Sequence, residues 1–161
     1  MNKETLKSHI DEHPLLRTMN PRHREILADC AVEKEFKPDQ VIFRQGDYAD
    51  QFYLIQTGKV ALESHTPDRS NLLIQTLGAG EALGWSWLFP PFVWHFQARA
   101  VEATRTIAFS GAHLLVACEK DTDLGYDLMK RVSQVLNQRL QATRKKLVDL
   151  CEGRSQSPVC K

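Results

Sequence analysis

The sequence predicts a mainly β domain with flanking helices, built as an antiparallel sandwich or barrel. Between residues 31 and 110, short strand-like stretches rich in branched and aromatic residues recur at even spacing. Turn residues such as Pro38, Gly46 and Gly58 separate these stretches, as is typical of antiparallel sandwiches and barrels. Helical patterns occupy only the two ends of the chain, which disfavours a parallel α/β sheet because such sheets alternate strands with helices.

The composition indicates one globular domain without a strong electrostatic field. The chain has 161 residues, of which 42% are hydrophobic and 25% are charged, enough to bury a core without disulfides. Its net charge of +1 gives no global attraction to nucleic acid or anionic lipid. The first residues are polar and lack the apolar region of a signal peptide, and no apolar stretch has the length of a membrane span. We therefore expect a cytoplasmic protein that does not associate with membranes.

The cysteines and histidines give no sign of a metal centre. The four cysteines form no C-x-x-C pair and no zinc-like spacing. A cupin-type metalloenzyme would need a His-x-His pair on an inward-facing strand, and none of the six histidines forms one. That hypothesis ranks third, and we expect no enzymatic activity, no metal and no cofactor. The cysteines are Cys30, Cys118, Cys151 and Cys160, of which the first two are interpreted as buried thiols.

The N-terminal segment, residues 1–30, is predicted to be helical in two short pieces from about residue 8. Asn20 followed by Pro21 is a capping residue with proline at the first helical position. Residues 31–110 form the β region, with a hairpin loop at residues 66–71. Its strands are expected at residues 32–36, 41–43, 52–55, 59–63, 72–77, 97–101 and 105–109.

The C-terminal segment, residues 111–151, is predicted to form two helices. Ser110 can cap a short helix, and the acidic pair Asp121 and Asp123 offers caps for a long helix over residues 124–151. Residues 152–161 have the composition of a flexible tail.

A heptad pattern on the long helix predicts a homodimer. The repeating positions form an a/d stripe of about three heptads, with two polar members, as in helices that pair side by side. The alternative is that this stripe packs on the protein's own strands, but Leu128, Val132 and Val135 can do so from an adjacent face. The expected dimer seam consists of Met129, Ser133, Leu136, Leu140, Thr143 and Leu147, and it extends to Leu150.

Four features together resemble the cyclic-nucleotide-binding domain of the catabolite activator (Crp–Fnr) superfamily. Residues 42–47 (IFRQGD) are similar to the family's strand and glycine turn, and residues 52–60 (FYLIQTGKV) to its tyrosine–leucine–isoleucine strand. Residues 77–84 (LGAGEALG) correspond to the approach to its phosphate-binding cassette. The long C-terminal helix is the fourth feature, and the resemblance spans about residues 14–150.

The resemblance implies a β-roll of double-stranded β-helix (jelly-roll) type that senses a small molecule and regulates a partner without catalysis. Transcription regulators of this family carry a helix-turn-helix after the long helix. This chain ends shortly beyond that helix, so we expect no direct DNA binding. Whether the chain is part of a longer protein stays open.

The cassette departs from the family pattern at the residues that hold the nucleotide. The family places a glutamate for the ribose hydroxyl after its glycine, whereas Gly84 is followed by Trp85. The family binds the cyclic phosphate with adjacent arginine and serine, and the matching residues here are Trp94 and His95. Arg99 matches an arginine that looks structural in the family. Without the bidentate arginine a buried phosphate lacks its matched charge, so we expect weak binding of cyclic AMP and cyclic GMP.

Residues 84–96, called the cassette segment below, are unusually aromatic and hold all three tryptophans of the chain. Such a pocket suits a flat or hydrophobic ligand, bound partly by backbone amides at a helix start. The alternative is that the rings plug the cavity of a ligand-free module that docks a protein partner, and the sequence leaves both open. The candidate ligand-binding residues are Gly84, Trp85, Ser86, Trp94, His95, Gln97 and Arg99.

Overall fold

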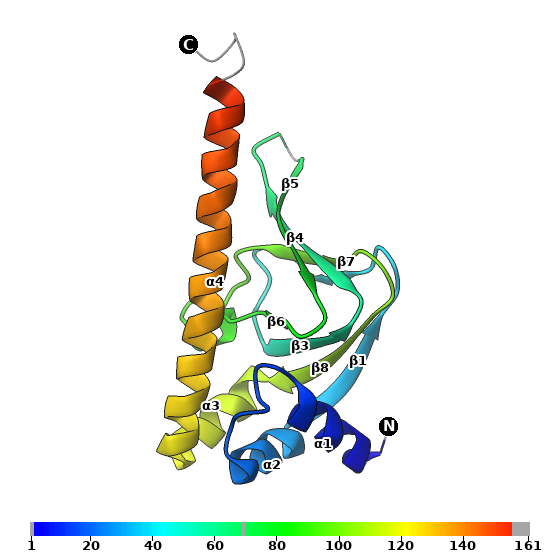
Figure 1. Ribbon diagram of the computed structural model, residues 1–161, viewed down its shortest axis with the longest axis vertical. Coiled ribbons are helices and arrows are strands. Elements are labelled where there is room, and N and C mark those ends of the chain that lie inside the picture. Colours follow the sequence, from blue (N-terminus) through cyan, green and yellow to red (C-terminus); the bar gives the residue numbers. More distant parts are fainter. Residues whose placement is uncertain (1, 69, 156–161) are drawn as a thin grey trace.

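The computed structural model describes residues 2–68 and 70–155. It confirms the predicted fold class: a β-roll of two antiparallel four-stranded sheets, with N-terminal helices at one end and one long helix along its side (Figure 1). None of the described helices is long and apolar enough to cross a membrane. The elements in chain order are α1 (Lys3–Glu12), α2 (Pro21–Asp29), β1 (Ala31–Phe36), β2 (Val41–Phe43), β3 (Gln51–Thr57), β4 (Lys59–His65), β5 (Asn71–Gly78), β6 (Ala82–Leu83), the 3-10 helix η1 (Ser86–Leu88), β7 (Gln97–Ala100), β8 (Thr104–Ser110), α3 (Gly111–Lys120) and α4 (Thr122–Ser155).

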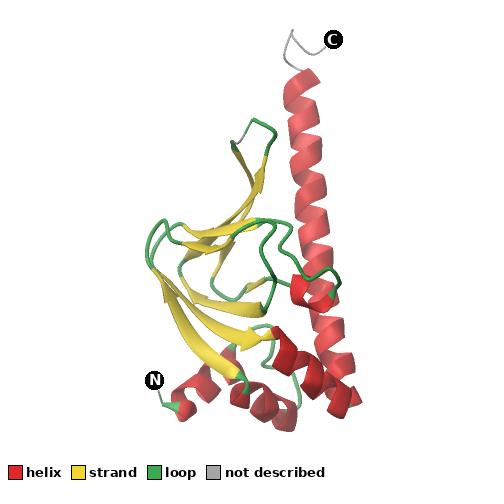
Figure 2. Cartoon of the chain, turned by 180° about the vertical axis from the view of Figure 1, so that it is seen from behind, coloured by secondary structure: helices red, strands yellow, loops and turns green. Residues whose placement is uncertain are grey.

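The strands pair in the orders β1-β8-β3-β6 and β2-β7-β4-β5. Every strand predicted from the sequence is present. β6 was not predicted, because its two residues lie within a glycine-rich turn and become a strand only by pairing with Tyr53 and Leu54 of β3. β4 and β5 continue beyond the roll as a hairpin beside α4 (Figures 1 and 2). Arg69, in the loop of this hairpin, lies outside the described residues.

The helix starts follow the capping residues. The Asn20 side chain accepts the backbone N–H of Arg22 at 2.9 Å, and Pro21 is the first residue of α2. Ser110 and Asp121 likewise accept backbone N–H groups in the first turns of α3 and α4. Each cap satisfies one of the N–H groups that a helix start leaves without a partner.

Two helices extend beyond their predicted bounds. α1 begins at Lys3 instead of near residue 8, and α4 continues through residue 151 to Ser155. The rest of the predicted tail, residues 156–161, lies outside the described residues, and so does Cys160.

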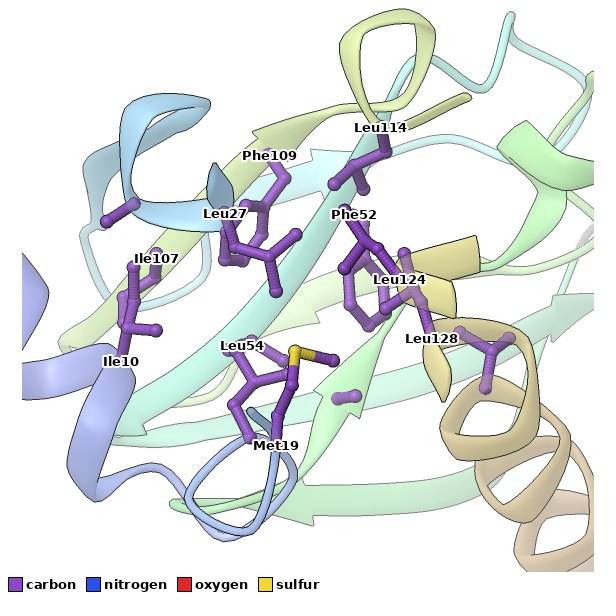
Figure 3. Close-up of a cluster of buried hydrophobic side chains, with 14 of the residues drawn as sticks. Ile10, Met19, Leu27, Phe52, Leu54, Ile107, Phe109, Leu114, Leu124 and Leu128 are labelled. Atoms are coloured by element: carbon purple, nitrogen blue, oxygen red, sulfur yellow. The ribbon is translucent and has the colours of Figure 1, made fainter. Parts of the chain in front are cut away.

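Alternation along β3 divides the interior into two clusters. Phe52 and Leu54 face the helices, whereas Tyr53 and Ile55 face the interior of the roll, as expected for successive strand residues. The helix-side cluster joins N-terminal, strand and C-terminal side chains, including those of Ile10, Met19, Leu27, Phe109, Leu114, Leu124 and Leu128 (Figure 3). The roll-side cluster consists of Tyr53, Ile55, Val60, Leu62, Leu77, Leu83, Ala98 and Ala108.

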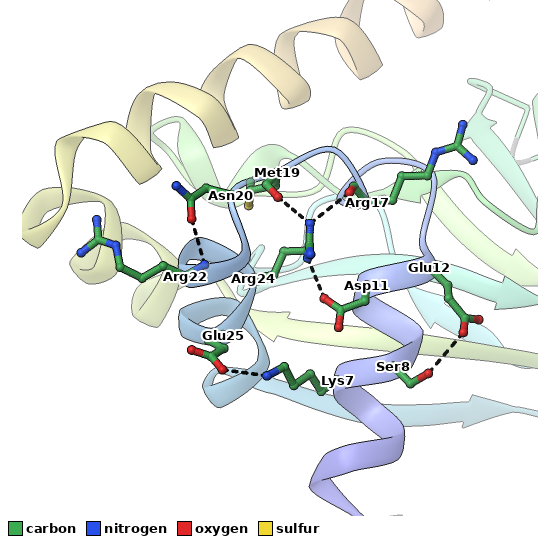
Figure 4. Close-up of polar contacts among 10 residues, drawn as sticks. All are labelled: Lys7, Ser8, Asp11, Glu12, Arg17, Met19, Asn20, Arg22, Arg24 and Glu25. Atoms are coloured by element: carbon green, nitrogen blue, oxygen red, sulfur yellow. Dashed lines mark hydrogen bonds and ion pairs between the residues drawn. The ribbon is translucent and has the colours of Figure 1, made fainter.

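The connection between α1 and α2 is fixed by polar contacts. Arg24 donates from Nε to Asp11 Oδ1 at 2.6 Å, and from Nη1 to the carbonyl oxygens of Arg17 and Met19 (Figure 4). Charge-assisted hydrogen bonds of this kind are among the stronger ones. These bonds from α2 therefore hold the α1–α2 connection, which faces α4, in one conformation.

His13 ends α1 and is buried, with 5% of its surface exposed. Its Nδ1 accepts the backbone N–H of Leu15 at 3.2 Å. Burial disfavours the charged imidazolium and lowers the pKa of His13 from 6.5 to about 4. The side chain is therefore neutral at physiological pH.

Candidate functional site

The cassette segment leaves β6 through Gly84, whose backbone only glycine adopts easily. Gly84 has φ +85°, and a Cβ there would lie 2.8 Å from Cη2 of Trp94 and 3.2 Å from the carbonyl oxygen of Gln51. The Trp87 side chain, which is buried on the helix side, donates from Nε1 to the Gly84 carbonyl at 3.0 Å. Because Gly84 has no Cβ, Trp94 packs against it, while Trp87 on the helix side bonds to its carbonyl oxygen.

The segment encloses a small cavity inside the roll, called the roll cavity below. Its volume is about 20 Å³. A water molecule needs roughly 10–15 Å³ by the same measure, so the cavity has room for about one water. The lining residues are Phe43, Leu62, Leu83, Gly84, Trp85, Ser86, Trp94, His95 and Phe96.

Trp94 is a buried side chain in the wall of the roll cavity. Its ring stacks on Phe43 with centroids 3.8 Å apart and planes at 12°, and only 4% of the residue is exposed. Its backbone N–H donates to the carbonyl of Asp47 at 2.9 Å, and its carbonyl accepts from Gly46 at 2.8 Å. Backbone and side chain together fix this indole within the roll.

The outer wall of the roll cavity is more open. Trp85 is half-buried and meets Phe96 edge to face, with ring centroids 6.5 Å apart, while His95 is exposed. Ser86 is buried at the start of η1. Five of the seven candidate ligand-binding residues therefore lie together around one cavity: Gly84, Trp85, Ser86, Trp94 and His95.

The other two candidates, Gln97 and Arg99, do not line the roll cavity. Gln97 donates to Glu63 at 3.1 Å, and Arg99 pairs with Glu63 at 2.7 Å and with Asp39 at 3.0 Å. Burial acts to raise the pKa of Glu63, but the hydrogen bonds from Arg99 and Gln97 outweigh it and hold that pKa below its ordinary value. The Arg99 charge is thus already matched by carboxylates on the outside of the roll.

Sequence reasoning missed four lining residues: Phe43, Leu62, Leu83 and Phe96. Leu62 could have been found from strand alternation, because Val60 and Leu62 share the inward face of β4. Phe43 could not, since its role depends on a stack with Trp94 from a distant part of the chain.

The comparisons with known proteins agree with this architecture. Residues 33–121, more than half of the chain, match the family described as the cyclic nucleotide-binding domain. This chain belongs to that family. A 71-residue stretch, 44% of the chain, is 34% identical to the cAMP-dependent protein kinase type II regulatory subunit of Drosophila melanogaster but covers only 19% of that protein.

Solved structures resemble this cyclic nucleotide-binding domain over most of its length. A putative cyclic nucleotide-binding protein from Geobacter metallireducens has a TM-score of 0.72 and 26% identity, over 87% of this chain and 98% of that one. The regulatory subunit of a cAMP-independent protein kinase A from Trypanosoma cruzi, bound to guanosine, has a TM-score of 0.70 and 18% identity, over 94% of this chain and 51% of that one. At 18% identity, the likeness to the Trypanosoma cruzi protein shows only that the two proteins share a fold. Domains of this family are typically regulatory and non-catalytic.

The chemistry of this cyclic nucleotide-binding domain offers little for metal binding. Among residues 2–68 and 70–155, no cluster of three His, Cys, Asp or Glu side chains could hold a metal ion. Cys30 and Cys118 are half-buried free thiols, and burial raises the pKa of both. The lining of the roll cavity is mainly aromatic and aliphatic.

The predicted seam on α4 is only partly covered by the protein's own core. Leu124, Leu128, Val132 and Val135 are buried against the core. Among the seam residues, Met129 and Leu136 are partly buried, Ser133 and Thr143 are exposed, and Leu140 and Leu147 are 63% and 61% exposed. Met129 and Leu136 pack at the edge of the helix-side cluster, so the apolar part of the seam that is free of the core is its C-terminal half, with Leu140 and Leu147.

Proposed function

We propose that this domain is a regulatory sensor with a degenerate cassette, whose effector is small, flat and largely apolar instead of a standard cyclic nucleotide. The observation that carries this proposal is Trp94, which fills the roll beside a cavity of about 20 Å³ where a nucleotide would need far more room. We treat the domain as a non-enzymatic sensor, in keeping with a family whose domains are typically regulatory.

The electrostatics of the site support the same conclusion. A cyclic phosphate in a low-dielectric roll needs a matched cation and several N–H donors. Trp94 stands where the family places its arginine, and Arg99 is committed to Glu63 and Asp39. Trp85 replaces the acceptor for the ribose hydroxyl. Each lost charge-assisted hydrogen bond is worth about 1.5–3 kcal/mol.

A flat ring can use what the site does offer. Phe43 and Trp94 already form a parallel stack. If the Trp94 side chain moved aside, a ligand ring could therefore stack on Phe43 in its place. Half-buried Trp85 and exposed His95 form the wall through which such a ligand would enter. The Trypanosoma cruzi relative bound to guanosine supports the idea that this fold accepts a ligand without a cyclic phosphate.

We propose further that two copies pair through the α4 seam. The exposed apolar side chains of Leu140 and Leu147 are spaced by seven residues, as in a coiled-coil interface. Direct binding to DNA or to a membrane forms no part of this proposal.

A ligand-free interaction module is the second candidate function. The closed stack of Trp94 on Phe43 favours it, because an indole that permanently plugs the roll leaves only surfaces for a partner. In that case the seam or the cassette surface would be the functional part.

Tryptophan fluorescence separates the two candidates, since all three tryptophans lie in the cassette segment. The full chain would be titrated with planar probes, namely guanosine and adenosine, with cyclic AMP as the comparison. Saturable quenching or a spectral shift with a planar probe supports the sensor. A flat response to every probe, in a protein shown to be folded by circular dichroism, supports the scaffold.

A further inference from the structure

A second and larger cavity lies outside the roll, between α4, the α1–α2 connection and the turn that precedes β6. Its volume is about 540 Å³, within the range of about 300–1,000 Å³ typical of small-molecule sites. We call it the α4 groove. Its polar side chains come from Thr18, Gln75, Glu81, Arg131, Gln134, Gln138 and Arg139.

The α4 groove is separate from both proposed sites. It shares no lining residue with the roll cavity. Gln134 and Gln138 precede the seam residues Leu136 and Leu140 by two positions, which is about 200° around an α-helix. A partner helix on the seam would therefore leave the groove open.

Arg139 is a charged side chain almost enclosed in the wall of the groove, with 6% of its surface exposed. Its Nη2 donates to the carbonyl oxygen of Ala82 at 2.7 Å, and Nη1 lies 3.5 Å from Glu81 Oε1, at the limit of a hydrogen bond. Within the described residues, its Nε–H has no acceptor at all. Burial lowers the pKa of this guanidinium below its ordinary value, because the nearby carboxylate compensates for the lost water only in part.

Arg131 gives the groove a second, rigidly placed guanidinium. Its Nε and Nη2 donate to the two carboxylate oxygens of Asp127 at 2.8 and 3.4 Å, which pairs its charge, and its Nη1 donates to the Leu15 carbonyl at 2.6 Å and to Thr18 Oγ1 at 2.9 Å. These bonds tie α4 to the α1–α2 connection, which Arg24 fixes from the other side. A wall held in this way loses little entropy when a ligand binds.

Hydrogen-bond donors outnumber acceptors around the groove. Both arginines donate only, and the carboxamides of Gln134 and Gln138 can each donate two N–H groups. The one carboxylate in the lining, Glu81, already accepts the backbone N–H of Gly78 at 2.7 Å. A ligand that matches this wall must be rich in acceptor oxygens.

We propose that the α4 groove binds a small anionic molecule rich in oxygen, a phosphate or carboxylate compound, through Arg139 and the carboxamides of Gln134 and Gln138, in a wall that Arg131 holds in place. Guanidinium groups bind such oxyanions through paired N–H donors, and the anion would add acceptors beside Arg139, whose ion pair with Glu81 is long at 3.5 Å. The volume of the groove fits a metabolite larger than a lone phosphate ion. This site is independent of the effector proposed for the roll.

Nuclear magnetic resonance of the full 15N-labelled chain tests this proposal. The protein is titrated with inorganic phosphate and, separately, with citrate, at constant ionic strength with chloride as the reference anion. We expect saturable shifts at Thr18, Gln75 and the α4 residues of the groove, with a dissociation constant of about 1 mM or tighter for at least one anion. Saturation by phosphate alone identifies a phosphate compound, and saturation by citrate alone identifies a carboxylate.

Variants distinguish the groove from general attraction to surface cations. Gln134→Ala with Gln138→Ala removes two exposed donors without touching the core, and we expect binding about tenfold weaker. Arg139→Lys keeps the charge but loses the guanidinium fork, and it should weaken binding further. Arg144→Lys, at an exposed arginine beyond the groove, should change nothing.

Two results would overturn the proposal. One is the absence of saturable shifts with either anion. The other is equal binding by the wild type and the double glutamine variant, which would mean adventitious surface binding. Because the glutamines are exposed, this second comparison holds even if Arg139→Lys fails to fold.

Discussion

Replacing Trp94 with alanine removes the indole that fills the roll. Trp94 is 4% exposed and stacks on Phe43 at 3.8 Å, so the substitution removes buried apolar area and leaves a cavity. Truncating a buried aromatic residue to alanine typically reduces the free energy of unfolding by about 3–5 kcal/mol. Since the indole lies parallel to the Phe43 ring and is almost fully buried, we expect the loss of unfolding free energy in Trp94→Ala to fall within this range.

Urea-induced unfolding, followed by far-ultraviolet circular dichroism, measures this loss. The matched control is Trp85→Ala, which removes the same side chain from a half-buried position and should have a smaller effect. Trp94→Phe keeps a ring on Phe43 and serves as a milder variant if the alanine variant unfolds. A loss below about 1 kcal/mol for Trp94→Ala would refute the argument that this indole plugs the roll.

The cavity left by Trp94→Ala should also accept a ring from solution. Its walls are mostly apolar, and engineered apolar cavities of this kind bind small aromatic molecules. Saturating indole should therefore raise the unfolding midpoint of the variant by more than that of the wild type, in which Trp94 must first move aside, because a ligand stabilises a protein in proportion to its affinity for the folded state. Equal effects on both proteins would contradict the assignment of Trp94 to that space.

Three further predictions concern other parts of the molecule. Gly84→Ala forces a Cβ to φ +85° and to within 2.8 Å of Trp94, so it should lower the free energy of unfolding by about 1–3 kcal/mol in urea titrations. Gly153→Ala, at an open position of α4, should be neutral or stabilising in the same assay. Replacing Leu140 and Leu147 by glutamate should convert a dimer into a monomer in sedimentation, and a wild type that is monomeric at high concentration would refute the seam. The pKa of His13 falls from 6.5 to about 4 on folding, so the unfolded chain binds its proton first as the pH drops. The free energy of unfolding should therefore decrease by up to about 3 kcal/mol between pH 6.5 and pH 4, and His13→Gln should remove that part of the pH dependence.

The fold could be predicted from the sequence where local chemistry decides the structure. The caps at Asn20, Ser110 and Asp121 begin helices in the structure because their side chains satisfy nearby backbone groups. The glycines at positions 58 and 84 both adopt positive φ at tight turns. β6 could not be predicted, because two residues carry no periodic pattern and only their pairing with β3 makes them a strand.

The candidate site could be predicted only in part. The aromatic composition located the cassette segment, and five of its candidate residues do surround one cavity. Gln97 and Arg99 face away from it because Ala98, between them, occupies the inward position on β7. Their partner Glu63 lies more than thirty residues earlier in the chain, and a single sequence does not reveal such a pair.

Isothermal titration calorimetry with cyclic AMP and cyclic GMP tests the central claim most directly. Two lost charge-assisted hydrogen bonds of about 1.5–3 kcal/mol each amount to at least the roughly 2.7 kcal/mol of a hundredfold loss in affinity. The filled roll beside Trp94 adds steric exclusion to that loss. We predict that both nucleotides bind at least about a hundredfold more weakly than to an intact cassette, or produce no heat at all. A dissociation constant below about 1 μM for either nucleotide would contradict the account, because it would show that the cassette works despite its substitutions.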